Sequence, residues 1–156
     1  VTGVEHNIPI APLYKDVTEL WRNTQVGNTP TLVVNYGGLN AERYWYARDN
    51  VWENERLLRF FPKNSLYGQT IRRDTAPDWD YYHVEVAKAA KRLRDNGTLI
   101  LVGGHGQLQG MAPHWEIWSL AQGGFSPWEA LRAATIDGAA YLGLAKEIGS
   151  LEAGKR

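Results

Sequence analysis

Two histidines stand at places where an imidazole could do chemistry. His6 lies in the run Glu5-His6-Asn7, and His105 lies in the glycine-rich run 103–110. Each is expected to follow a β-strand, and function gathers in the loops that follow the strands of parallel α/β folds. An imidazole there can ligate a metal ion or act as a general base near neutral pH. The alternative for each is a structural histidine that is hydrogen-bonded to loop backbone.

The other two histidines are weaker candidates. His114 lies near the start of a helix expected over residues 112–121, where it could face the loop mouth or pack against another helix. Glu116 follows it by two residues, so the two side chains point to different sides of that helix and do not form an HExxH zinc motif. His83, at the start of a longer helix, is expected to be a surface or packing residue.

Several other kinds of site are excluded. The glycines around His105 lack the Lys-Ser/Thr of a P-loop and the spacing of a dinucleotide loop, so a nucleotide site is not expected. The chain has no Gly-x-Ser-x-Gly elbow and no cysteine, which rules out that type of serine nucleophile, any cysteine nucleophile, disulfides and thiolate metal sites. Any metal ion must therefore be held by His, Asp or Glu.

Composition narrows the class of protein. The 156 residues are enough for one domain with a sizeable core, and seven Trp and eight Tyr argue against disorder. Seventeen basic residues balance seventeen acidic ones, whereas a nucleic-acid binder or a polybasic membrane adaptor would carry a basic excess. No apolar run is long enough to span a bilayer. The absence of cysteine is compatible with the cytoplasm or the periplasm.

The elements that must position the histidines alternate between strands and helices. Short strands are expected at the N-terminus and in the aliphatic runs 31–35 and 98–102. Helical signals occur over residues 16–24, 78–96 and 112–121. A capping box at Ser126 predicts a further helix with Leu131 and Leu142 on its apolar face. This order predicts a parallel α/β sheet.

Residues 36–77, between the second expected strand and the longest helix, are rich in aromatic side chains. Their helical signals are weaker than those of the flanking elements. They predict either a packing subdomain or a long active-site or interface excursion.

The number of strands predicts that the chain is part of a larger fold. Three parallel strands flanked by helices leave open edges, and a barrel of this type needs eight strands and about 250 residues. The chain also opens at Val1 without a methionine or a signal-peptide pattern, and it stops at Arg156 just after an expected turn. We therefore expect both ends to continue.

The C-terminal third carries a series of motifs: Trp115-Glu116-Ile117-Trp118, Gly123-Gly124-Phe125-Ser126-Pro127, Glu129-Ala130-Leu131-Arg132-Ala133-Ala134-Thr135, Leu142-Gly143-Leu144 and Gly149-Ser150-Leu151-Glu152-Ala153-Gly154-Lys155. In this register they resemble the end of the metal-dependent amidohydrolase superfamily, especially its imidazolonepropionase-like and prolidase-like branch. At the start, Gly3-Val4-Glu5-His6 followed by Pro30-Thr31-Leu32 resembles the sixth-strand motif of that superfamily. The aromatic middle resembles the amidohydrolases that follow a TolB-like β-propeller domain.

The resemblance implies the C-terminal part of a (β/α)8 TIM barrel. Residues 1–156 would hold about strands six to eight with their helices, and residues 143–156 would start the return towards a small β-sandwich. One or two divalent metal ions are implied, expected to be zinc, together with hydrolysis of a C–N bond by metal-activated water.

The resemblance also assigns roles to single residues. His6 matches the metal-binding histidine of the sixth strand, and His105 stands where the family has an Asp after the eighth strand. We expect His105 to bind metal and to act in catalysis, because a neutral imidazole can still bind zinc or take a proton. It does not supply the negative charge of a carboxylate. Gln107 and His114 are expected to bind substrate.

The sequence thus predicts a fragment of a metal-dependent amidohydrolase that cleaves amide, cyclic amide or peptide-like bonds and is inactive on its own. Its expected partners are a small-molecule or peptide-like substrate, the rest of the barrel, a TolB-like propeller domain and further copies in a homo-oligomer. The alternative is a non-catalytic degenerate barrel or assembly module that lacks the usual metal-binding Asp.

Overall fold

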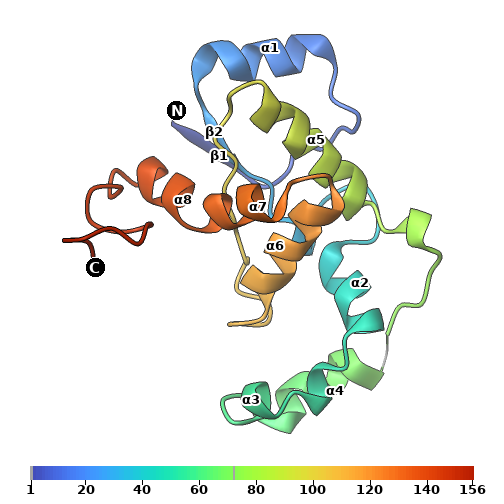
Figure 1. Cartoon of the computed structure of the whole chain (residues 1–156). Helices are drawn as coiled ribbons and strands as arrows, with labels where there is room; N and C mark the ends of the chain where they lie inside the picture. Colours follow the sequence, from blue (N-terminus) through green and yellow to red (C-terminus); the bar gives the residue numbers. More distant parts are fainter. Residues whose placement is uncertain (1, 72) are drawn as a thin grey trace.

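Three short parallel segments form the centre of the computed structural model, which describes residues 2–71 and 73–156. β1 (Gly3–Glu5) pairs with β2 (Gly27–Thr29), and Gly3 lies opposite Gly27. On its other side, β2 meets the extended segment 98–102 through a parallel bridge between Asn28 and Ile100. Figure 1 shows the two strands and this segment side by side. The predicted parallel α/β arrangement is confirmed.

Asn28 joins all three segments. Its backbone N–H donates to Leu99 O at 2.9 Å, and its carbonyl accepts from Leu101 N at 3.0 Å. Its side-chain amide donates to Val4 O and to His6 O, both at 3.0 Å. Because Asn28 is only 2% exposed, these bonds are shielded from competition with water.

The predicted strand over residues 31–35 is wrong. The middle strand ends at Thr29, Thr31 takes the left-handed conformation (φ 54°), and η1 (Leu32–Val34) is a 3-10 helix. Leu32 and Val33 are fully buried, as an interior strand would be, but their N–H groups donate to the Glu116 carboxylate at 2.7 and 3.1 Å. A side chain thus takes the place of a neighbouring strand as hydrogen-bond partner.

Helices cover the parallel segments, and their bounds agree broadly with the sequence patterns: α1 (Lys15–Thr24), α5 (His83–Asp95), α6 (Ala112–Gln122), α7 (Pro127–Ala134) and α8 (Ile136–Tyr141). The helix predicted from residue 78 begins later, because Asp78–Asp80 form a separate 3-10 helix, η3. The capping box at Ser126 is confirmed. The helix that it starts breaks at Thr135, and Leu131 and Leu142 are exposed rather than buried.

The aromatic excursion builds a core of its own. It contains α2 (Ala41–Arg48), η2 (Val51–Glu53), α3 (Glu55–Leu58) and α4 (Lys63–Ile71). In Figure 1 these elements group at the end of the molecule opposite α1. Their buried side chains meet Leu108 and Trp115, from the 103–110 run and from α6. The excursion therefore contributes to packing, as one of the two alternatives expects, and it also contacts the loop that carries His105.

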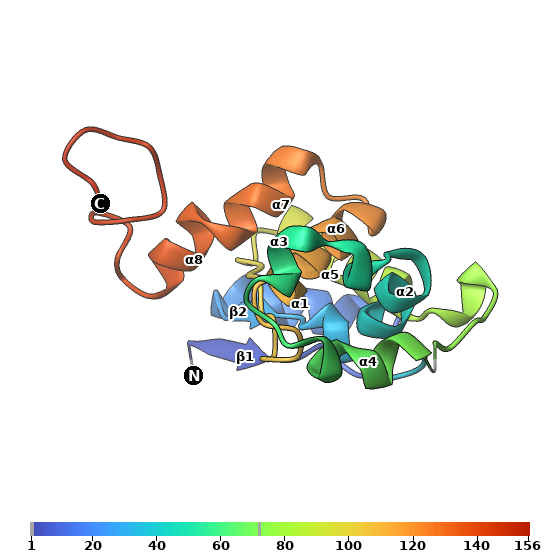
Figure 2. The same cartoon turned by 90° about the horizontal axis from the view of Figure 1, so that it is seen from below.

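The segment after α8 consists of turns and stands away from the helices, as Figure 2 shows. Arg156 N donates to Glu147 O at 2.9 Å and closes the segment on itself. Within the described residues, no helix combines the length and the apolar character needed to cross a membrane.

Glu116 is the most unusual titratable group in the fold. Complete burial raises the pKa of its carboxyl from the ordinary 4.5 to about 8, although the backbone N–H groups of Leu32 and Val33 act in the opposite direction. The unfolded chain releases this proton near the ordinary pKa. Unfolding therefore releases a proton between about pH 5 and pH 8, and the free energy of unfolding falls as the pH rises through that range.

Replacing Glu116 by Gln should flatten this pH dependence. The amide does not titrate, so the variant is expected to lose a fall of several kcal/mol between about pH 5 and pH 8. Chemical denaturation of both chains at several pH values measures the difference. The other titratable groups, His83 among them, are common to both chains and cancel in that difference. Parallel pH profiles in the two chains would contradict the prediction.

Candidate active site

His6 and His105 lie side by side. His6 directly follows β1, and His105 comes three residues after the segment 98–102, so both stand at the carboxyl ends of parallel segments. Their ring centroids are 5.1 Å apart with an angle of 63° between the planes. The structure thus brings together the two histidines that the sequence singled out, across 99 positions of chain.

The backbone at this end of the sheet is strained. His6 (φ 68°), Thr31 (φ 54°) and His105 (φ 50°) all adopt the left-handed conformation, one after each of the three parallel segments. Each such residue costs about 1–3 kcal/mol, and strain of this kind gathers at functional sites. At His6, the hydrogen bond from the Asn28 amide to the carbonyl helps to hold the conformation.

Two buried polar atoms close to His6 lack partners. His6 Nδ1 and Asn35 Oδ1 have no hydrogen bond to any of the described residues. Their segments are joined, because the Tyr36 N–H donates to Asn7 Oδ1 at 3.0 Å and the Tyr36 ring centroid lies 6.0 Å from that of His6. Both atoms therefore keep hydrogen-bonding capacity that the described residues do not use.

Gln107 orients the His105 ring. Its Oε1 lies 3.2 Å from His105 Nδ1. Burial raises the pKa of the nearby Glu42 carboxyl on α2, and Gln107, Arg43 and His105 act in the opposite direction. An amide oxygen can only accept a hydrogen bond, so the contact with Gln107 Oε1 requires a donor at His105 Nδ1. Nδ1 of His105 therefore carries the proton, and Nε2 is free to bind or to accept one.

Glu42 was not among the residues predicted from the sequence. It lies in the excursion, 63 positions before His105, and nothing in its local pattern sets it apart from a solvated helix residue. Only the packing of α2 against the rest of the molecule buries it, to 9% exposure.

His114 lies elsewhere. It lines a pocket of about 280 Å³ together with Leu57 and Phe61 of the excursion and residues 109–111, and that lining includes neither His6 nor His105. His114 is exposed and stacks obliquely on Trp118, with 6.2 Å between ring centroids. Its predicted role in substrate binding stays a prediction.

The sequence left open whether His83 is a surface residue or a packing residue, and the structure shows that it is a packing residue. It is fully buried, with Nε2 at 2.9 Å from Gln122 Oε1. Burial lowers the pKa of its imidazole to about 4, so it is neutral at physiological pH.

The spacing of His6 and His105 fits a shared metal ion. Two imidazoles on one tetrahedral Zn²⁺, each about 2.1 Å from the ion, place their ring centroids about 5 Å apart. Among residues 2–71 and 73–156, however, no three His, Asp or Glu side chains come together as a metal site. The described residues thus supply two donors, and a complete coordination shell needs further ligands.

Replacing Gln107 by Ala should release the His105 ring from its single tautomer. In the parent, the protonated Nδ1 gives a distinct pair of ring ¹⁵N chemical shifts, and in the variant these should move towards those of a free imidazole. The matched control is Gln109→Ala, which removes a nearby exposed glutamine that does not contact His105. Identical ring shifts in the parent and in Gln107→Ala would show that Gln107 does not fix the tautomer.

A comparison with known protein families gives a match over the larger part of the chain. A model of the amidohydrolase family matches residues 58–156, which include His105, Gln107 and His114 and leave His6 outside. No curated protein and no solved structure matches the chain.

Proposed function

Since the chain belongs to the amidohydrolase family, we propose that it forms part of a metal-dependent hydrolase that cleaves C–N bonds in amide, cyclic amide or peptide-like substrates. The observation that carries the proposal is the meeting of His6 and His105, 5.1 Å apart between ring centroids, at the carboxyl ends of the parallel segments. In parallel α/β folds, this is the end where catalytic groups gather.

The proposed architecture is the last part of a (β/α)8 barrel. β1, β2 and the segment 98–102 would be strands six, seven and eight, since they are parallel neighbours in chain order and helices follow each of them. The outer sides of β1 and of the segment 98–102 would then pair with the remaining strands. Residues 143–156, which form turns that extend away from the helices, would lead back to a small β-sandwich.

His6 and His105 would hold the divalent ion, which we expect to be zinc. Such an ion supplies a Lewis acid and an activated water when it is bound. The His105 imidazole presents Nε2 as a metal ligand or as a proton acceptor, because Gln107 occupies Nδ1. The orphaned Nδ1 of His6 offers the second nitrogen donor.

Substrate binding is proposed for Gln107 and His114. The run 103–110 leads from the histidine pair to the 280 Å³ pocket that His114 lines. The lining of that pocket combines apolar side chains, among them Leu57 of α3, with Arg56, a mixture that suits an apolar substrate group with a polar end.

The second candidate function is a non-catalytic barrel or assembly module. It is favoured by the identity of residue 105, because the motif that the chain resembles has an Asp there and a neutral imidazole cannot supply its charge. The metal content of the full-length protein separates the two candidates.

Replacing His6 by Ala in the full-length protein should lower its metal content, and His105→Ala should lower the metal content or the hydrolytic rate. Metal analysis of the purified protein and an assay of amide hydrolysis measure these effects. His114→Ala, which removes an exposed histidine outside the pair, should retain the metal. Unchanged metal content and activity in both His6→Ala and His105→Ala would remove the pair from the site and favour the non-catalytic module.

The isolated chain of 156 residues should show no metal-dependent turnover, because its described residues bring at most two histidines together. The same assay with added Zn²⁺ tests this expectation. Zinc-dependent hydrolysis by residues 1–156 alone would contradict it and would mean that this part of the barrel holds a complete site.

A further inference from the structure

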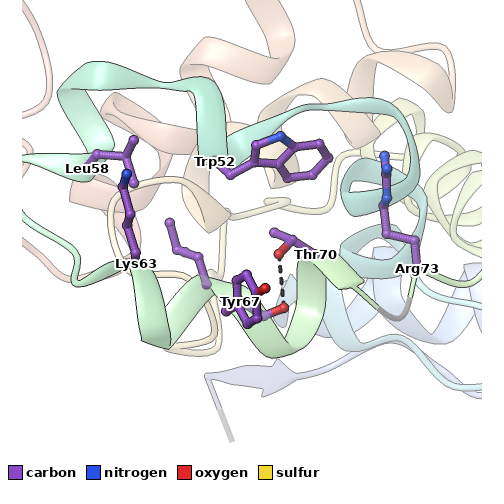
Figure 3. Close-up of a pocket in the computed structure, with 7 residues that line it drawn as sticks. Trp52, Leu58, Lys63, Tyr67, Thr70 and Arg73 are labelled. Carbon is purple, nitrogen blue, oxygen red and sulfur yellow. Dashed lines mark hydrogen bonds between the residues drawn. The ribbon is translucent and has the colours of Figure 1, made fainter.

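A pocket lies within the aromatic excursion. It has a volume of about 410 Å³ and opens between η2, α3 and α4, and it shares no lining residue with the histidine pair (Figure 3). Its lining consists of Trp52, Leu58, Lys63, Leu66, Tyr67, Thr70 and Arg73. The volume falls within the range typical of small-molecule sites.

Two cations stand at opposite ends of this pocket. Figure 3 shows Lys63 at one end and Arg73 at the other, with Trp52 and Tyr67 on facing sides between them. Lys63 is the first residue of α4, and Arg73 lies beyond its last residue, Ile71. The centre between them is apolar, and Leu66 is buried beneath it at 2% exposure.

Neither cation forms an ion pair with another described residue. Other arginines of the same subdomain do: Arg43 pairs with Asp74 at 3.2 Å, and Arg48 pairs with Asp78. Asp74 directly follows Arg73 in the chain, yet its carboxylate turns to Arg43 instead. None of the described residues that line the pocket is an Asp or a Glu, so the lining offers these two cations no carboxylate partner.

The aromatic rings add a preference for a flat ligand. The Arg73 guanidinium carbon lies 4.5 Å from the centroid of the Trp52 ring, so a cation–π contact holds the cation against one wall. A planar apolar group between Trp52 and Tyr67 would contact the rings of both residues. Charged oxygens at its two ends would reach the ammonium of Lys63 and the guanidinium of Arg73.

We propose that this pocket binds a flat organic dianion, an aromatic or conjugated molecule with a carboxylate at each end. The site is separate from the proposed hydrolytic centre, because the two have no lining residue in common, and it does not depend on whether that centre holds metal. It lies in the excursion that leaves the carboxyl end of β2.

The probe for this site is 2,6-naphthalenedicarboxylate, measured by isothermal titration calorimetry on the full chain, with 2,6-naphthalenedicarboxamide as the uncharged counterpart. The dicarboxylate should bind at least about tenfold more tightly than the diamide, and its affinity should fall with added salt. Lys63→Ala and Arg73→Ala should each weaken the dicarboxylate about tenfold and leave the diamide unchanged.

Arg59→Ala is the matched control, since it removes an exposed arginine of the same subdomain that does not line the pocket. Trp52→Leu, which keeps an apolar side chain but removes the ring, should weaken both ligands. All four positions are at least partly exposed, so circular dichroism should show the fold intact. Equal affinity for the dicarboxylate and the diamide, absence of dicarboxylate binding, or an equal effect of Arg59→Ala and Arg73→Ala would each overturn the proposal.

Discussion

The hydrogen bonds of Asn28 hold together the part of the molecule on which everything else depends. This one buried residue bonds the segment 98–102 through its backbone and β1 through its side chain. One of those side-chain bonds ends on the carbonyl of His6, in the strained turn that aims the imidazole at His105. An aliphatic residue of the same size would leave the carbonyls of Val4 and His6 without that donor. The spacing of the histidine pair is therefore set from the middle strand.

The Glu116 carboxylate determines how the chain leaves that strand. By accepting the N–H groups of Leu32 and Val33, it turns the backbone out of the sheet directly after β2. The residues that follow are then free to form a separate group of helices with its own core. That group buries Glu42 beside Gln107 and forms the pocket between Lys63 and Arg73.

The family match and the geometry concern different residues of the candidate site. The match covers residues 58–156 and so includes His105 but not His6. The structure supplies the connection, because it places the imidazole of His6 against that of His105. The side chain at position 105 is an imidazole whose Nδ1 lies within hydrogen-bond distance of a neighbouring amide oxygen. Gln107, two residues along, supplies that oxygen.

The sequence by itself determined the features that local physics controls. It located α1, α6 and the capping box at Ser126, and it selected His6 and His105 from their places after expected strands. It could not place the middle strand, because the buried run 31–35 has the composition of a strand and only the distant Glu116 carboxylate makes it a 3-10 turn. It could not single out Glu42 or pair His6 with His105, since those relations join residues about 60 to 100 positions apart. Helix caps and periodicity act within a few residues, whereas burial and side-chain contacts across the sheet exist only once the chain has folded.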